Sequence, residues 1–160
     1  MGFLGKLFKK EASDNTPRGF FNVKVKAINR LTKDAVEVVF DIPQDLKSTF
    51  QFLPGQYITV CTIIRGKEER RSYSICSAQN ADLAIGVKEV QGGKVSTWIN
   101  NSLKAGDSIL ISKPEGRFLL GDAKNVVAIA AGSGITPILS MAASLQSTGG
   151  QMTLLFANKT

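Results

Sequence analysis

The chain contains no histidine and only two cysteines among its 160 residues. Without histidine it cannot form a Ser-His-Asp or Cys-His nucleophile system, or any metal site that needs an imidazole ligand. Cys61 and Cys76 form no C-x-x-C pair and cannot hold an iron–sulfur cluster by themselves. Both lie in apolar segments, so we expect buried, unreactive thiols, with a disulfide as the alternative. The sequence therefore predicts no metal site.

Long apolar runs are absent as well. No stretch approaches the roughly 20 apolar residues that cross a membrane. The apolar part of the N-terminal "MGFLGKLFKK" is too short for the core of a signal peptide, and Lys6 stands where a myristoylation pattern requires Ser or Thr. We expect residues 1–19 to form a basic tail, with a short amphipathic helix as the alternative. The sequence thus predicts a cytoplasmic protein without stable membrane insertion.

The composition of the chain permits a folded core. Hydrophobic residues make up 43% of the sequence and charged residues 21%. The net charge is +7 and the pI is about 9.6, which favours anionic partners. Phosphate-rich small molecules, acidic proteins and nucleic acid all fit this description, so charge alone does not choose among them.

From Phe20 onward, apolar and polar residues alternate with the period of two that is typical of half-buried strands. The alternation and the Gly and Pro turns predict six strands, within residues 21–30, 35–42, 52–64, 70–76, 82–90 and 108–113. Val95, Ile99 and Leu103 recur at helical spacing and predict one helix, placed where a barrel needs a lid over its open end. The segment as a whole predicts a six-stranded antiparallel β-barrel, with a sandwich as the alternative.

After Gly121 the pattern changes. "NVVAIAA" at 125–131 is a continuous apolar run, typical of a parallel strand that is buried on both faces. A glycine turn, a predicted helix over 138–147 and a second apolar strand over 152–157 follow. This order predicts a βαβ unit, which is too small to complete a doubly wound sheet. We therefore expect an incomplete α/β lobe at 121–160.

Two glycine turns precede the predicted helices. In "GSGITP" at 132–137, a glycine turn between a strand and a helix start lets backbone N–H groups approach a phosphate. In "GGKVS" at 92–96, the exposed N–H groups can hold an anion in the same way. The alternatives are a tight turn without a ligand at the first site, and plain helix capping by Ser96 or Thr97 at the second.

The segment "RRSYSIC" at 70–76 is unusually polar for a strand. Strict alternation places Arg71 and Tyr73 on one face, about 6.6 Å apart, and the serines on the other face. The cation could then hold a phosphate while the aromatic ring stacks on a flat group of the same ligand. The alternative is an exposed face on which the arginines pair with Glu68 and Glu69.

Taken together and in order, these motifs resemble the ferredoxin–NADP reductase superfamily of flavoproteins, and in particular the reductase components of phenylacetyl-CoA oxygenases. The resemblance covers 20–160 and depends on "FLPGQYITV", "RRSYSICS", "GVKEVQGGKVSTWI", "PEGRF", "AAGSGITPIL" and "LLFANKT". It implies an FAD-binding β-barrel at 20–120, followed by the start of an NAD(P)-binding lobe at 121–160.

The resemblance also implies roles for individual residues. Arg71 would bind the FAD pyrophosphate, Tyr73 would stack on the flavin, and Ser74 would hydrogen-bond near flavin N5, so that Tyr73 and Ser74 are the candidate catalytic residues. The other implied cofactor-binding residues are Ser72, Val87, Lys88, Gly93, Lys94, Val95 and Ser96 for FAD, and Gly132, Ser133, Gly134, Ile135, Thr136 and Pro137 for NADP or NAD.

The implied function is that of a reductase that moves hydride from NAD(P)H to FAD. Electrons then pass to an iron–sulfur or oxygenase partner, or to a ferredoxin-type domain outside this chain. Hydride transfer requires no protein acid or base, so the lack of histidine fits this chemistry. Lys159 would favour a 2′-phosphate, but NAD and NADP both remain open. A non-catalytic FAD- or nucleotide-binding module is one alternative, and an oligonucleotide-binding barrel, which explains neither glycine turn, is another.

Overall fold

The structure is a computed structural model that describes residues 16–158. The expectations for most of the N-terminal tail and for Lys159 lie outside the described residues. Across 16–158, no helix is both long enough and apolar enough to cross a membrane. In the same part of the chain, no three Cys, Asp or Glu side chains are grouped as ligands of a metal ion would be.

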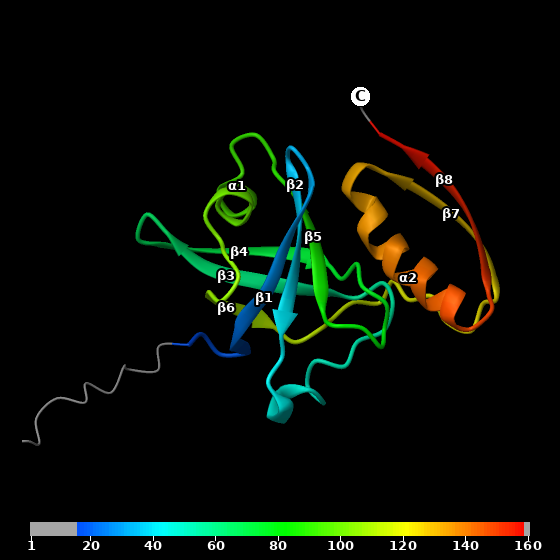
Figure 1. Cartoon of the computed structure of the whole chain (residues 1–160), viewed down its shortest axis with the longest axis horizontal. Coiled ribbons are helices and arrows are strands. Elements are labelled where there is room, and N and C mark those ends of the chain that lie inside the picture. Colours follow the sequence, from blue (N-terminus) through cyan, green and yellow to red (C-terminus); the bar gives the residue numbers. More distant parts are fainter. Residues whose placement is uncertain (1–15, 159–160) are drawn as a thin grey trace, which may run out of the picture.

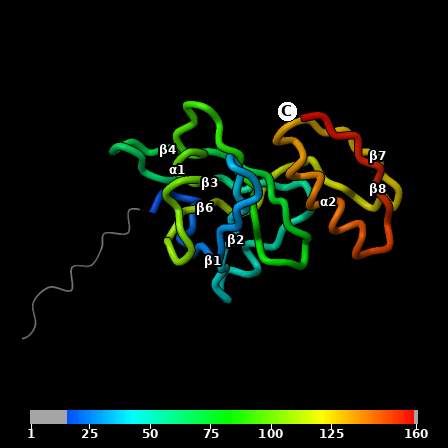
Figure 2. The backbone as a smooth tube through the Cα atoms, turned by 45° about the horizontal axis from the view of Figure 1, so that its top comes forward, coloured from blue at the N-terminus to red at the C-terminus, as the bar shows by residue number. Residues whose placement is uncertain are grey.

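The chain forms a β-barrel and a smaller lobe that lie side by side (Figures 1 and 2). The barrel contains β1 (Phe20–Thr32), β2 (Ala35–Asp41), β3 (Tyr57–Ile64), β4 (Lys67–Ser74), β5 (Ala84–Lys88) and β6 (Ser108–Ser112), with the short helix η1 (Gln44–Leu46) and the helix α1 (Lys94–Asn101). The lobe contains β7 (Asn125–Ala131), η2 (Gly132–Gly134), α2 (Ile135–Ser147) and β8 (Gln151–Ala157). We propose 20–120 and 121–160 as the two domains.

The six barrel strands form one antiparallel sheet in the order β4-β3-β6-β1-β2-β5. The two edge strands then approach each other, because Ile75 and Ile85 form an antiparallel bridge. The backbone N–H of Cys76 also donates to the carbonyl of Ala84 at 2.9 Å. These contacts close the sheet, and they confirm the antiparallel barrel with six strands.

The alternating residues of the strands fill the barrel. Val23 and Val25 of β1, and Val36, Val38 and Phe40 of β2, are buried in one core cluster. Burying a side chain of this size contributes roughly 1.5–3 kcal/mol to stability. Burial of the alternating apolar side chains is therefore the main force that closes these strands into a barrel.

The helix α1 lies over one end of the barrel, as the sequence predicts. Its buried residues Val95 and Ile99 belong to the same core cluster as the strands. On its inner side, the amide of Asn100 donates to the carbonyl of Val87 at 3.2 Å. Two buried apolar residues and the hydrogen bond of Asn100 therefore hold α1 next to β5.

The helix α2 lies between the barrel and the parallel pair β7–β8 (Figure 1). One side of α2 packs on Ala128 and Ala130 of β7. On the other side, the Ser140 hydroxyl donates to the carbonyl of Ser77 at 2.7 Å. A Cβ atom at Gly55 of the barrel would lie 2.5 Å from the terminal methyl carbon of Met141 in α2, so the absence of a side chain permits this close approach. The two parts of the molecule are therefore in direct contact.

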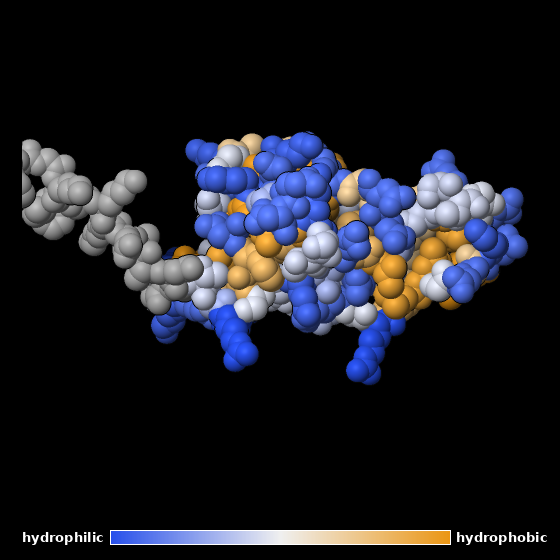
Figure 3. All heavy atoms as spheres, turned by 90° about the horizontal axis from the view of Figure 1, so that it is seen from below, coloured by the Kyte–Doolittle hydropathy of each residue, from blue (hydrophilic) through white to orange (hydrophobic). Residues whose placement is uncertain are grey.

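The prediction that β7 is buried on both faces is wrong. Val127 and Ile129 are 71% and 79% exposed, and Leu155 of β8 is 58% exposed. The physical reason is that α2 covers one face of the two-stranded sheet, while no other element within 16–158 covers the opposite face. Figure 3 shows hydrophobic side chains gathered at the surface of this lobe.

The strand β3 begins at Tyr57, directly after the predicted Pro-Gly turn, in which Gln56 N–H donates to the Leu53 carbonyl. The strand β4 begins three residues earlier than expected, since Arg65 and Gly66 both have positive φ and make a tight hairpin turn. The consecutive polar residues at 67–69 gave no alternation from which this pairing could be inferred.

Candidate functional site

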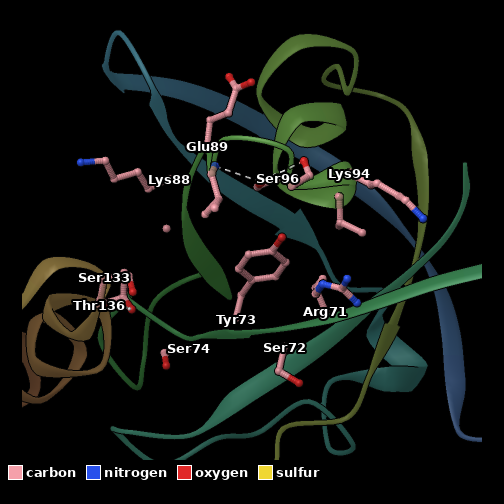
Figure 4. A pocket seen from close by; sticks show the side chains of 14 residues that line it. Arg71, Ser72, Tyr73, Ser74, Lys88, Glu89, Lys94, Ser96, Ser133 and Thr136 are labelled. Carbon is pink, nitrogen blue, oxygen red and sulfur yellow. Dashed lines mark hydrogen bonds between the residues drawn. The ribbon is translucent and has the colours of Figure 1, made fainter.

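A cavity of about 550 Å³ lies between β4, β5 and the starts of α1 and α2 (Figure 4). Its volume lies within the range of small-molecule and cofactor sites, about 300–1,000 Å³. The lining residues are Arg71, Ser72, Tyr73, Ser74, Gly86, Lys88, Glu89, Val90, Gly93, Lys94, Val95, Ser96, Ser133 and Thr136. The cavity thus brings together all three segments that the sequence singles out.

The strand β4 supplies one wall of the cavity. The ring of Tyr73 points into its centre, and burial raises the pKa of the phenol above its usual value (Figure 4). Ser72 and Ser74 lie on the other side of the strand, as alternation predicts (Figure 4). The hydroxyl of Ser72 forms a hydrogen bond of 3.0 Å with that of Thr59. Ser74 is the last residue of β4, so it borders the cavity at the end of the strand.

Two cations lie at one end of the cavity. The guanidinium of Arg71 is 3.8 Å from the carboxylate of Glu69, and it donates to the carbonyl of Arg70 at 2.6 Å. The ammonium group of Lys94 also contacts Glu69. The hydrogen bond from Lys94 is the main reason why the pKa of Glu69 lies below its usual range. Arg71 therefore forms the ion pair with Glu69 that the alternative interpretation of this strand expects, and it also lines the cavity.

The neighbouring Arg70 has a different environment. Its guanidinium donates to Glu68 at 2.7 Å and lies 4.8 Å from the centre of the Phe20 ring. Neither Arg70 nor Glu68 lines the cavity. The alternation along β4 thus gives two adjacent arginines different neighbours, and it leaves Arg71 as the arginine of this site.

The start of α1 forms the second wall. No side chain caps this helix: the Ser96 hydroxyl accepts from Val90 N–H at 3.1 Å and donates to the Gly93 carbonyl at 3.2 Å. The Thr97 hydroxyl donates to Glu89 at 3.0 Å. The expectation that Ser96 or Thr97 caps α1 is therefore wrong, because both residues lie inside the helix rather than at its N-cap. The first N–H groups of α1 have no partner within the helix and can donate hydrogen bonds to an anion.

The residue before α1 must be small. A Cβ atom at Gly93 would lie 2.5 Å from the Ser96 hydroxyl oxygen and 2.9 Å from the Val90 carbonyl oxygen. Both distances are shorter than van der Waals contact, so the close turn ahead of the helix depends on glycine at this position.

The start of α2 approaches the cavity from the second lobe. Within 132–137, only Ser133 and Thr136 line the cavity. The Thr136 hydroxyl donates to the carbonyl of Ser133 at 2.9 Å and closes the turn. On the barrel side, a Cβ atom at Gly86 would lie 2.9 Å from the Thr136 methyl group. The lobe and the barrel thus meet at this edge of the cavity.

Several predicted site residues do not line the cavity: Val87, Gly132, Gly134, Ile135 and Pro137. Val87 is buried in the barrel core, so only its backbone is available to a ligand. Three lining residues were missed, namely Gly86, Glu89 and Val90. A glycine inside a strand often marks a close approach of another group, so Gly86 carried a signal in the sequence. The roles of the individual residues stay predictions.

The cysteines lie outside this site and are both free. Cys61 is buried, as expected, whereas Cys76 is only partly buried. Burial is the main cause that raises the pKa of both thiols, that of Cys76 to about 12. Both therefore remain protonated thiols near neutral pH, in agreement with the expectation of unreactive groups.

The residues of the cavity fit an extended cofactor with an anionic linker and a flat ring system. Arg71 and the start of α1 provide positive charge at one end, and the Tyr73 ring provides an aromatic face in the middle. Ser74 and Thr136 provide hydroxyl groups at the other end. This order of chemical groups corresponds to the pyrophosphate and the flavin of FAD.

Comparison with known proteins agrees with this fit. The family model described as an oxidoreductase FAD-binding domain matches residues 22–119. The 1,2-phenylacetyl-CoA epoxidase of Escherichia coli strain K12 has a component that is 34% identical over 148 residues, which cover 88% of this chain and 42% of that component. The chain therefore spans less than half of the length of that relative.

Solved structures with the same fold include two with clear sequence similarity. The flavohem-like FAD/NAD binding domain of the nitric oxide dioxygenase from Vibrio cholerae O1 biovar El Tor has a TM-score of 0.77 and 31% identity, covering 87% of this chain and 62% of that chain. Phthalate dioxygenase reductase has a TM-score of 0.70 and 26% identity, covering 89% and 44% respectively. The chain thus belongs to the oxidoreductase FAD-binding domains of the ferredoxin–NADP reductase superfamily, and FAD is its cofactor.

Proposed function

We propose that this chain is the flavin-binding part of a reductase that takes hydride from NADH or NADPH and delivers electrons to an iron–sulfur or oxygenase partner. The observation that carries the proposal is the meeting of the barrel and α2 at one cavity, where Thr136 approaches Gly86. A nucleotide held at the turn before α2 would therefore lie next to a flavin held by β4. Phthalate dioxygenase reductase is described as a modular structure for electron transfer from pyridine nucleotides to [2Fe-2S], which supports the proposal.

The residues of the chain would bind and orient the reactants rather than exchange protons with them. Arg71 and the N–H groups at the start of α1 would hold the pyrophosphate, and Tyr73 would fix the plane of the ring system. Ser74 would donate a hydrogen bond at the edge of that ring. When bound, FAD supplies the redox chemistry, since it accepts hydride and can release electrons one at a time. The turn at 132–137 would hold the pyrophosphate of the nicotinamide dinucleotide.

A second candidate function is that of a non-catalytic FAD- or nucleotide-binding module. The observation that favours it is the small sheet of the second lobe, whose β7 and β8 leave Val127, Ile129 and Leu155 exposed. A lobe in this state would offer an incomplete surface to a dinucleotide. In that case the barrel would bind FAD, but the bound flavin would not be reduced by NADH or NADPH.

Anaerobic titration of the FAD-loaded protein with NADH, and separately with NADPH, distinguishes the two functions. We expect loss of the oxidised flavin absorbance with at least one nucleotide, and the faster of the two reactions identifies the preferred donor. A flavin that stays oxidised with both nucleotides, yet is reduced by dithionite, would contradict the reductase and support the module. Binding of single-stranded oligonucleotides without any binding of FAD would instead support the barrel as a nucleic-acid module.

A further inference from the structure

We infer that Glu69 is a positioning residue that holds Lys94 against β4 and thereby leaves Arg71 as the cation that binds the phosphates of the flavin. This inference deepens the proposed function, because it rests on the assignment of the cavity to FAD. Glu69 lies on β4 two residues before Arg71, and Lys94 is the first residue of α1. The carboxylate therefore connects the β3–β4 hairpin to the helix that covers the barrel.

The exposure of the three side chains indicates which of them is structural. The side chain of Glu69 is only 12% exposed, whereas those of Arg71 and Lys94 are 59% and 56% exposed. Both cations line the cavity, but Glu69 does not. The carboxylate thus lies behind the two cations, where it can orient them without occupying the space of the ligand.

The two ion pairs are unequal. The Lys94 ammonium is hydrogen-bonded to the carboxylate, and this bond is the largest cause of the lowered pKa of Glu69. Arg71 is 3.8 Å from the same carboxylate, which is beyond hydrogen-bonding distance. One guanidinium N–H instead donates to the carbonyl of Arg70. The remaining N–H groups of Arg71 are available to a phosphate, whereas Lys94 is already committed to Glu69.

Removing the carboxylate has two opposing effects on FAD affinity. It takes a negative charge away from a site that binds an anion, which favours binding. It also releases Arg71 from the carboxylate that helps to orient it, so more motion of this side chain must be lost when the phosphates bind. Because the site is open to solvent, screening at physiological salt weakens the first effect, so we expect the second to dominate. The net result should be weaker binding of FAD, by about fivefold to tenfold.

The test is the affinity of Glu69→Gln for FAD and for riboflavin, which carries no phosphate, measured by quenching of flavin fluorescence. The matched control is Glu68→Gln, since Glu68 is the adjacent carboxylate on β4 and pairs with Arg70 away from the cavity. We expect Glu69→Gln to weaken FAD binding while riboflavin binding stays unchanged, and Glu68→Gln to change neither.

Other results of the Glu69→Gln experiment would contradict either this inference or the proposed function. If Glu69→Gln binds FAD as tightly as the unmodified chain or more tightly, the carboxylate acts only as a counter-charge and the inference is wrong. If FAD and riboflavin binding weaken equally and the flavin-free variant unfolds at a lower temperature, Glu69 is merely structural and the inference is also wrong. If the unmodified chain binds FAD but is not reduced by NADH or NADPH, the proposed reductase fails while this inference stands.

Discussion

Alanine at position 86 should disturb the contact between the barrel and the second lobe at the edge of the flavin cavity. The new Cβ atom would lie 2.9 Å from the methyl carbon of Thr136, whereas carbon atoms in contact prefer about 3.5–4.0 Å. Rotation of the Thr136 side chain would relieve the clash, but it would break the hydrogen bond of 2.9 Å to the Ser133 carbonyl. That bond contributes about 0.5–1.5 kcal/mol.

The alternative relief is a shift of α2 away from β5, and overpacking of this kind costs about 1–3 kcal/mol. The less costly relief decides the outcome, so we expect Gly86→Ala to lower the free energy of unfolding by about 0.5–1.5 kcal/mol in urea denaturation. It should also weaken FAD binding, because Thr136 lines the same cavity as Tyr73. The loss should be visible in both measurements.

A second substitution separates this clash from a general effect of alanine in the strand. Thr136→Ser removes the methyl group but keeps the hydroxyl, so it should have little effect alone. In the double variant, the cost of Gly86→Ala should largely disappear, which corresponds to a coupling energy of about 0.5–1.5 kcal/mol. Strictly additive effects of the two substitutions would refute the proposed contact.

Three further predictions concern the phosphate end, the core and the thiols. Arg71→Ala should weaken FAD binding by about 1.5–3 kcal/mol in calorimetric titration and weaken FMN binding less, because FMN lacks the pyrophosphate; equal losses would place this side chain elsewhere. Ile58→Ala, inside the barrel, should lower the free energy of unfolding by about 2–5 kcal/mol, whereas Ile63→Ala on the same strand is exposed and should have little effect, as chemical denaturation can show. Because the pKa of the Cys76 thiol is raised to about 12 and that of Cys61 is also raised, both should react with a thiol reagent at pH 8 much more slowly in the folded chain than in denaturant; rapid labelling of the native chain would contradict their environment.

The barrel could be predicted from the sequence because alternate side chains are buried in strands such as β1, β2 and β3. In β1 and β2 the alternation of Val23, Val25, Val36 and Val38 with polar residues records that burial directly. At 67–69 every residue is polar, so the alternation is lost and the start of β4 could not be located. Periodicity therefore predicts an element only where one of its faces differs from the other.

Features that depend on tertiary contacts could not be read from the sequence. The exposure of Ile129 reflects which face of β7 is covered by α2, not the apolar character of the strand. The hydrogen bonds of Ser96 depend on the turn that brings Val90 back over the start of α1. The ion pair between Glu69 and Lys94 joins residues far apart in the chain, and no local pattern indicates it.

The cavity also combines residues that the sequence predicts with residues that only tertiary contacts reveal. In "RRSYSIC", the charge of Arg71 and the aromatic ring of Tyr73 are evident from the residue types. Both residues could therefore be predicted as ligand-binding from the sequence, and both line the cavity. Gly86 contributes by lacking a side chain. A glycine inside a strand indicates a close approach, but only the structure shows that Thr136 is the group that approaches. Sequence patterns do not show which distant residue packs against a glycine or pairs with a charged side chain.

The most direct test of the flavin assignment is the amount of FAD bound by the purified 160-residue chain after it is incubated with excess FAD and the free cofactor is removed. We expect a yellow protein that retains FAD in a fixed ratio to the chain, and that loses most of this FAD when Arg71 is replaced by alanine. A folded, colourless protein that retains no FAD would contradict the assignment of the cavity between β4, α1 and α2 to this cofactor.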